Sequence, residues 1–155
     1  MIPIKPIRQK PSHCGPACLE MVLSYYGKKI TQQQIAKHAG TTHAQGTPPH
    51  SLVKEAQRHG CIANYIQEGT HAQLHRWVMR ERIPVIVDWF SVDDGHYSVC
   101  VHLTKKNIWL ADPEYGKIRR MDWNTFYRNW FDFTGNYLRK KNDIRLRGMI
   151  IIRPF

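Results

Sequence analysis

Cys14 is the residue whose surroundings point most directly to chemistry. It stands before Gly15-Pro16, where proline predicts the first turn of a helix. The sulfur would then lie at the positive end of the helix dipole, which favours the thiolate, the nucleophilic form of cysteine. Gly15 leaves room for a substrate backbone, and the side-chain amide of Gln9 could join the backbone N–H of Cys14 in stabilising an oxyanion. These residues predict acyl transfer to a cysteine; the alternative is that Cys14 is a small buried hydrophobe.

His96 and Asp112 are the candidate partners of Cys14. His96 follows the turn-forming run Asp93-Asp94-Gly95 and opens an apolar strand, while Asp112 ends the next strand. Because adjacent antiparallel strands bring such positions together, Asp112 could accept a hydrogen bond from one ring nitrogen of His96 and leave the other facing Cys14. Each residue alone fits a strand or a turn equally well. Their joint occurrence is what predicts a Cys-His-Asp site.

A helical first half must position the nucleophile. Proline, glycine and capping signals predict helices over residues 16–27, 31–40 and 47–60, and a fourth helix that begins after Thr70. Thr31 with Gln34 has the form of a capping box. Cys18 lies one helical turn beyond Cys14 and is expected to be a buried structural thiol.

A strand-rich second half must position the base. Apolar runs predict strands over residues 84–90, 96–103, 107–111, 117–120 and 148–153, the last closing the sheet. The strand that begins at His96 alternates as if one face were buried, and Cys100 on the same face is expected in the core. Residues 122–131 carry four aromatic side chains at helical spacing, which we assign to packing. Helices followed by a sheet indicate an α+β domain over residues 1–155.

Composition limits the classes of protein to which the chain can belong. Hydrophobic residues make up 42% and charged residues 23%, a balance typical of one folded domain rather than a disordered chain. No run approaches the roughly 20 apolar residues that span a bilayer, and the N-terminus has no secretory pattern. We therefore expect a cytoplasmic location with four reduced cysteines, of which Cys14 and Cys18 share a helical face, as do His71 and His75. Such pairs are common by chance, and we predict no metal site.

The net charge of +11 leaves a binding role open. We interpret the one local basic concentration as a solvated loop, with a patch for nucleic acid or an acidic partner as the alternative. It consists of Arg139, Lys140, Lys141, Arg145 and Arg147.

The segment around Cys14 resembles the nucleophile segment of the bacteriocin-processing cysteine peptidases, the papain-like domains that cut leader peptides after a double glycine. Residues 9–21 read QKPSHCGPACLEM and are followed by Tyr25-Tyr26-Gly27. Gly95-His96-Tyr97 and the run DPEYG at residues 112–116 resemble that family's base and orienting segments. The resemblance spans nearly the whole chain, in the family's order of Gln, Cys, His and Asp.

This resemblance implies a papain-like fold and a thiol amide hydrolase that acts on a peptide or protein without a metal or organic cofactor. Cys14 would attack, Gln9 would hold the oxyanion, His96 would transfer the proton and Asp112 would orient His96. The Gln9–Cys14 spacing is one residue shorter than usual, and His13 stands where the family often has an acidic residue. Because no transporter or ATPase region accompanies the domain, we expect a free-standing relative; a catalytically idle peptide binder remains the alternative.

Overall fold

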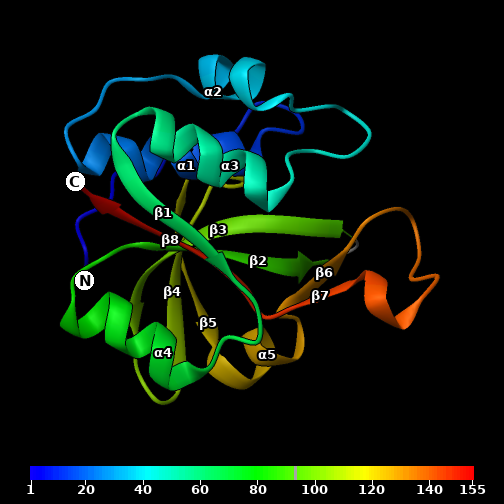
Figure 1. The fold of residues 1–155 in the computed structure, drawn as a ribbon. Helices are drawn as coiled ribbons and strands as arrows, with labels where there is room; N and C mark the ends of the chain where they lie inside the picture. Colours follow the sequence, from blue (N-terminus) through cyan, green and yellow to red (C-terminus); the bar gives the residue numbers. More distant parts are fainter. Residues whose placement is uncertain (93) are drawn as a thin grey trace.

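An antiparallel sheet runs through the centre of the molecule (Figure 1). The computed structural model describes residues 1–92 and 94–155, so Asp93 of the expected turn before His96 lies outside the described residues. Within them, six strands form one sheet in the order β1-β8-β2-β3-β4-β5, and β6 pairs with β7 in a separate hairpin. The strands are β1 (Cys61–Ile66), β2 (Val85–Ser91), β3 (Asp94–Leu103), β4 (Asn107–Asp112), β5 (Lys117–Asp122), β6 (Phe131–Phe133), β7 (Ile144–Leu146) and β8 (Gly148–Pro154).

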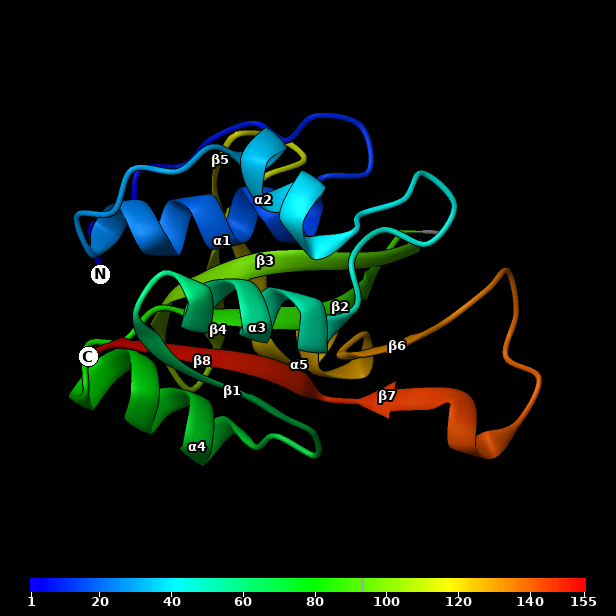
Figure 2. The same ribbon diagram turned by 45° about the horizontal axis from the view of Figure 1, so that its top comes forward.

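Helices cover both faces of this sheet. On one face lie α1 (Cys14–Tyr25), α2 (Gln32–Ala39) and α3 (Pro49–Arg58); on the other lie α4 (His71–His75), which continues as a π-helical turn over Arg76–Arg80, and α5 (Trp123–Arg128) (Figures 1 and 2). A 3₁₀ turn spans Lys141–Asp143 between β6 and β7. This layered arrangement confirms the predicted α+β class, with Cys14 on the helical side and His96 on the sheet.

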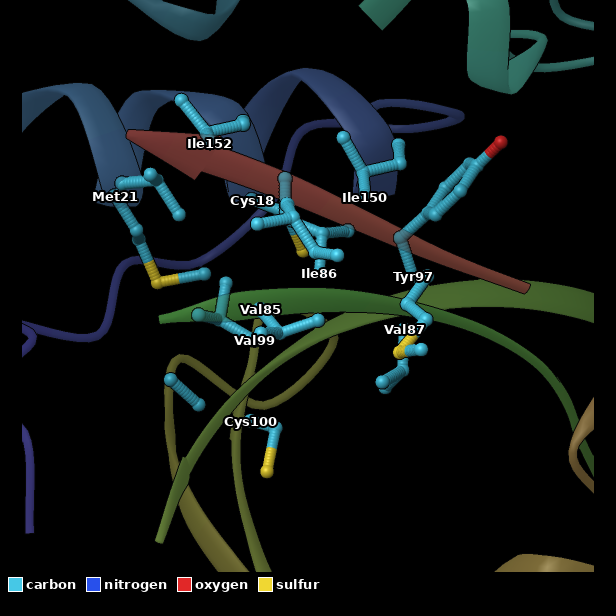
Figure 3. Packing of buried hydrophobic residues seen from close by; sticks show 14 of the residues in the cluster. Cys18, Met21, Val85, Ile86, Val87, Tyr97, Val99, Cys100, Ile150 and Ile152 are labelled. Carbon is cyan, nitrogen blue, oxygen red and sulfur yellow. The ribbon is translucent and has the colours of Figure 1, made fainter. Parts of the chain in front are cut away.

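The core extends over both faces of the sheet. Figure 3 shows Cys18 and Met21 of α1 among the branched side chains of β2, β3 and β8, and Cys100 on the opposite side of the sheet. Both cysteines are fully buried, as the sequence predicts. None of the helices in the described residues is long and apolar enough to cross a membrane.

Local signals place most helix ends correctly. Thr31 and Gln34 form the predicted capping box of α2, and Thr70 forms an equivalent box with Gln73 at α4. Helix α1 begins at Cys14, two residues before the predicted start at Pro16. Cys14 is therefore itself the first helical residue, which places its side chain at the helix N-terminus.

Three expectations about the sheet are wrong. Strand β1 falls in the half that we expect to be helical, because its short alternation of buried and exposed residues is hidden between two strongly patterned helices. Strand β8 does not close the sheet, since it lies between β1 and β2. Strand β3 is buried on both faces rather than one, because helices cover both sides of the sheet.

The basic segment is not a solvated loop throughout. Arg145 bonds Asp88 of β2 through Nε at 3.1 Å and Asp132 of β6 through Nη2 at 2.7 Å. Arg147 donates from Nε to the carbonyl of Gly69 at 2.8 Å. Arg145 therefore holds the β6–β7 hairpin against β2, whereas Arg147 holds the residue between β7 and β8 to the loop between β1 and α4. Only residues 139–141 of the expected basic patch remain as exposed cations.

Candidate active site

Close packing of α1 on β3 brings Cys14 to the sheet. A Cβ atom added to Gly15 would lie 3.0 Å from Leu52 Cδ1 and 3.2 Å from Tyr97 Cδ2. Contacts of 3.0–3.2 Å are tighter than nine in ten that real Cβ atoms make, so a larger residue would force these side chains to shift. The sequence suggests that Gly15 leaves room for a substrate backbone, but Gly15 is buried and does not do so. It sets the distance between α1 and β3, the strand that carries His96.

His96 and Asp112 form a buried hydrogen-bonded pair. Strands β3 and β4 are paired with Val99 opposite Ala111, which brings the start of one strand to the end of the other. His96 Nε2 lies 2.7 Å from Asp112 Oδ1, and both side chains are buried. The imidazole also interacts with Cys14. Burial lowers the pKa of His96, but the hydrogen bonds with Asp112 and with Cys14 outweigh it and raise the pKa to about 10.

Three donors surround the Asp112 carboxylate. Besides His96, the backbone N–H of Glu114 donates to Oδ1 at 3.0 Å, and Arg119 Nη1 donates to Oδ2 at 2.7 Å. Burial raises the pKa of Asp112. The hydrogen bond from His96, the positive charge of His96 and the hydrogen bond from Arg119 outweigh this effect and bring the pKa of Asp112 below its usual range. Asp112 is therefore held as an anion although its side chain is fully buried.

Arg119 is a residue of this site that the sequence reasoning missed. It lies on β5, two residues beyond the strand partner of Asp112, Lys117, and so on the same face of the sheet. Its guanidinium also lies over the ring of Tyr115, 4.4 Å from the centroid. The signal that could have found it is this diagonal relation across the β4–β5 hairpin, because the hairpin itself is predicted.

Gln9 lies on the extended segment that precedes α1 and lines the same cleft as Cys14 and His96. Its backbone N–H donates to the carbonyl of Pro113 at 2.8 Å, which fastens it to the turn after Asp112. Its side-chain nitrogen makes only a long contact, 3.5 Å, with the carbonyl of Lys10. The amide hydrogens therefore remain available to a substrate.

Gln32, another residue that sequence reasoning missed, fixes the peptide groups on both sides of Gln9. This buried side chain accepts from the backbone N–H of Lys10 at 2.8 Å and donates to the carbonyl of Arg8 at 3.0 Å. Its own backbone N–H donates to Glu20 Oε2 of α1 at 2.5 Å. Gln32 therefore ties the segment that carries Gln9 to the first two helices. No local pattern marks it, since both partners of its side chain lie more than 20 residues away.

A tight turn accommodates the short spacing between Gln9 and Cys14. The N–H of His13 donates to the carbonyl of Lys10 at 2.9 Å, and Ser12 adopts a positive φ of 62°. The ring of His13 bonds the carbonyl of Pro11 through Nδ1 at 2.8 Å. The chain thus reaches the start of α1 in one turn, with His13 engaged by the turn itself.

The cleft beside these residues has a volume of about 540 Å³. Its walls are the loop between α2 and α3, residues 43–48, and the end of β6 with residues 133–136, which lie on the same side of the molecule in both ribbon views (Figures 1 and 2). Tyr97 fixes the first wall by donating to the carbonyl of Thr47 at 2.9 Å. Phe90 also lines the cleft, whereas Trp89 is buried with its ring edge-on to His96 at 5.9 Å.

Cys14 differs from the other cysteines in its exposure. All four cysteines lie in the described residues and are free, and Cys14 alone among them is partly exposed. Burial raises the pKa of the Cys18, Cys61 and Cys100 thiols, which keeps them protonated. The arrangement therefore offers one accessible thiol, beside an imidazole that a buried carboxylate orients. Such a group can form and resolve a covalent bond to an acyl carbon.

Comparisons with known proteins place this geometry in a family. Residues 4–141 match the model of the Peptidase C39 family. The chain is 30% identical over 125 residues to the lactococcin-G-processing and transport ATP-binding protein LagD of Lactococcus lactis subsp. lactis, covering 79% of this chain but 17% of that protein. It is 34% identical over 127 residues to an uncharacterized protein of Methanothermobacter thermautotrophicus, covering 81% of this chain and 79% of that protein.

The fold agrees with that of a solved peptidase. The structure of a double glycine motif protease from an AMS/PCAT transporter, in complex with the leader peptide, matches with a TM-score of 0.77 and 21% identity over 99% of this chain and 94% of that one. This likeness confirms the papain-like fold that the sequence resemblance implies. Because the family model spans residues 4–141 and a relative matches along most of its own length, the chain belongs to the Peptidase C39 family.

Proposed function

We propose that the chain is a cysteine peptidase in which Cys14 is the nucleophile, His96 the general base and acid, and Asp112 the residue that orients His96. The observation that carries this proposal is the buried pair of His96 Nε2 and Asp112 Oδ1, 2.7 Å apart, beside the one partly exposed cysteine of the described residues. Gln9 and the backbone N–H of Cys14 are the proposed oxyanion donors.

The reaction follows from this arrangement in two steps. The Cys14 thiolate forms a C–S bond with the peptide carbonyl, whose oxygen becomes an oxyanion. Protonated His96 then gives its proton to the leaving nitrogen as the C–N bond breaks. In the second step, His96 removes a proton from water, the hydroxide attacks the thioester, and the C–S bond breaks to regenerate the thiolate. Every proton moves through His96, so the cycle requires no metal or organic cofactor.

The proposed substrate is a peptide that carries a double glycine before the cleaved bond, and residues 1–155 are proposed to act as one domain. The solved neighbour is described as a double glycine motif protease bound to a leader peptide, and LagD is named for processing lactococcin G. The match to LagD covers 17% of that protein, so this chain spans only a small part of its length. An open cleft beside Cys14 is consistent with an extended peptide.

Two reactions at the same sulfur test the roles separately. Iodoacetamide alkylates a thiolate without forming an oxyanion, whereas hydrolysis of a fluorogenic Gly-Gly peptide requires one. We expect His96→Ala to slow both reactions, and Gln9→Ala to slow hydrolysis by about 100-fold while it leaves alkylation unchanged. Cys61→Ser serves as the matched control for loss of a thiol. Equal alkylation of wild type and His96→Ala would overturn the activated pair. Rapid alkylation of Cys14 without cleavage of any peptide in a library would instead indicate a peptide-binding role.

A further inference from the structure

A second cluster of ligating side chains lies between α2 and α3. Glu55 is a buried carboxylate on α3, with 4% of its side chain exposed. His38, in the last turn of α2, places Nδ1 2.9 Å from Glu55 Oε1. His59, which follows the end of α3, places Nε2 3.0 Å from the same oxygen. Two imidazoles from different elements therefore converge on one oxygen of a carboxylate that is shielded from water.

This set has the composition of a zinc site. Two histidines and one glutamate hold zinc where a fourth position stays open to solvent. The three ligand atoms lie within 4.8 Å of one another. Zn²⁺ bonds of about 2.0–2.1 Å in tetrahedral geometry separate ligands by about 3.4 Å, so the nitrogen–oxygen separations need to widen by about 0.4 Å. The side chains of His38 and His59 are 34% and 26% exposed, which leaves a path for the ion and a water ligand.

Charge also favours an ion at this position. A negative charge on a carboxylate as buried as that of Glu55 is costly. A divalent cation would replace both hydrogen bonds with coordinate bonds and offset that charge. We propose that His38, Glu55 and His59 bind a divalent transition-metal ion, with zinc as the expected occupant. The site is independent of the proposed peptidase chemistry and differs from our expectation that the chain has no metal site.

The position of the cluster gives the ion a structural consequence. His38 lies in the last turn of α2 and Glu55 in the second half of α3, the two helices joined by the loop whose residues 43–48 form one wall of the cleft. Within that loop Thr42 and Gly46 pair with each other, and Thr41 Oγ1 bonds Thr47 Oγ1 at 2.6 Å. A bound ion would join the two helices below this wall. It would therefore oppose their separation.

The test uses Zn²⁺ and Co²⁺ alone as probes in a Cys14→Ser background, because a thiol beside His96 is itself a metal ligand. We expect Zn²⁺ to bind with one-to-one stoichiometry in calorimetry, and Co²⁺ to show the visible absorption of a four-coordinate ion. His38→Ala and His59→Ala should each weaken binding by tenfold or more, whereas His50→Ala, an exposed histidine of α3, should leave it unchanged. Saturating Zn²⁺ should raise the melting temperature by roughly 5–10 °C.

Three results would overturn the proposal. The first is no binding at zinc concentrations of about 100 µM. The second is binding that survives both histidine substitutions. The third is binding that is lost in His96→Ala instead, because His96, Asp112 and Glu114 form a competing cluster at the candidate active site. Circular dichroism of each variant separates loss of a ligand from loss of the fold, and His59→Gln provides a milder substitution if His59→Ala does not fold.

Discussion

Arg119→Met tests whether the buried Asp112 carboxylate needs Arg119, besides His96, to stabilise its negative charge. The substitution preserves most of the aliphatic stem of Arg119 and removes the 2.7 Å bond to Asp112 Oδ2. The carboxylate is fully buried and Arg119 is 31% exposed, so the bond is partly screened. A hydrogen bond to a charged group contributes about 1.5–3 kcal/mol. Loss of the stacking on Tyr115 adds about 0.5–1 kcal/mol.

We therefore expect Arg119→Met to lower the free energy of unfolding by about 3 kcal/mol, and the melting temperature by roughly 6–12 °C for a chain of this length. Urea unfolding and calorimetry measure the two quantities. Arg120→Met is the matched control, because Arg120 is the adjacent exposed arginine on the other face of β5. A change within about 0.5 kcal/mol is expected there. Arg119→Lys should recover part of the loss.

The pH dependence of the stability difference between wild type and Arg119→Met can refute this reasoning. The pKa of Asp112 is lowered in the folded protein, so its contribution is present above the unfolded pKa of about 3.9 and is lost as the pH falls through the folded pKa. The stability gap between wild type and Arg119→Met should therefore be complete at neutral pH and narrow in acid. A gap that stays constant with pH, or that Arg120→Met reproduces, would refute the reasoning.

Two further predictions concern His96 and the segment that carries Gln9. The folded pKa of His96 is raised, so its contribution to stability is complete below about pH 6.5 and is lost as the pH rises toward 10. In the wild type, kept reduced, the urea midpoint should fall through this window, and His96→Gln should abolish that fall; equal slopes would contradict the raised pKa. Gln32→Leu should lower kcat for peptide hydrolysis by roughly tenfold with little change in KM and no change in Cys14 alkylation, because it displaces one oxyanion donor. The exposed neighbour Gln33→Leu should have no effect, and an equal loss in both variants would show that Gln32 does not position Gln9.

Local signals were sufficient for the strands that hold His96 and Asp112. The strands of His96 and Asp112 are predicted from apolar runs, and their pairing as neighbours brings the two side chains to 2.7 Å. The capping box at Thr31 is likewise a local hydrogen-bond pattern. In each case the residues that determine the structure lie within a few positions of one another or on consecutive strands.

Long-range relations account for what the sequence did not reveal. Strand β1 is stabilised by pairing with β8, about 90 residues away, so its weak alternation alone could not identify it. Gln32 acts on residues 22 and 24 positions earlier. The role of Gly15 follows from Leu52 and Tyr97, which only the assembled layers bring into contact. A single sequence contains these residues and their partners, but it does not show which of them come into contact.

The ion pairs of Arg145 with Asp88 and Asp132 also restrict the motion of one wall of the cleft, at the end of β6. Asp132 of β6 is joined through Arg145 to Asp88 in the middle of the sheet, and burial together with the charge of Asp132 raises the pKa of Asp88. The hairpin therefore shares a cooperative unit with the sheet instead of fluctuating as an independent loop. Amides of β6 and β7 should exchange with solvent at rates close to those of β2.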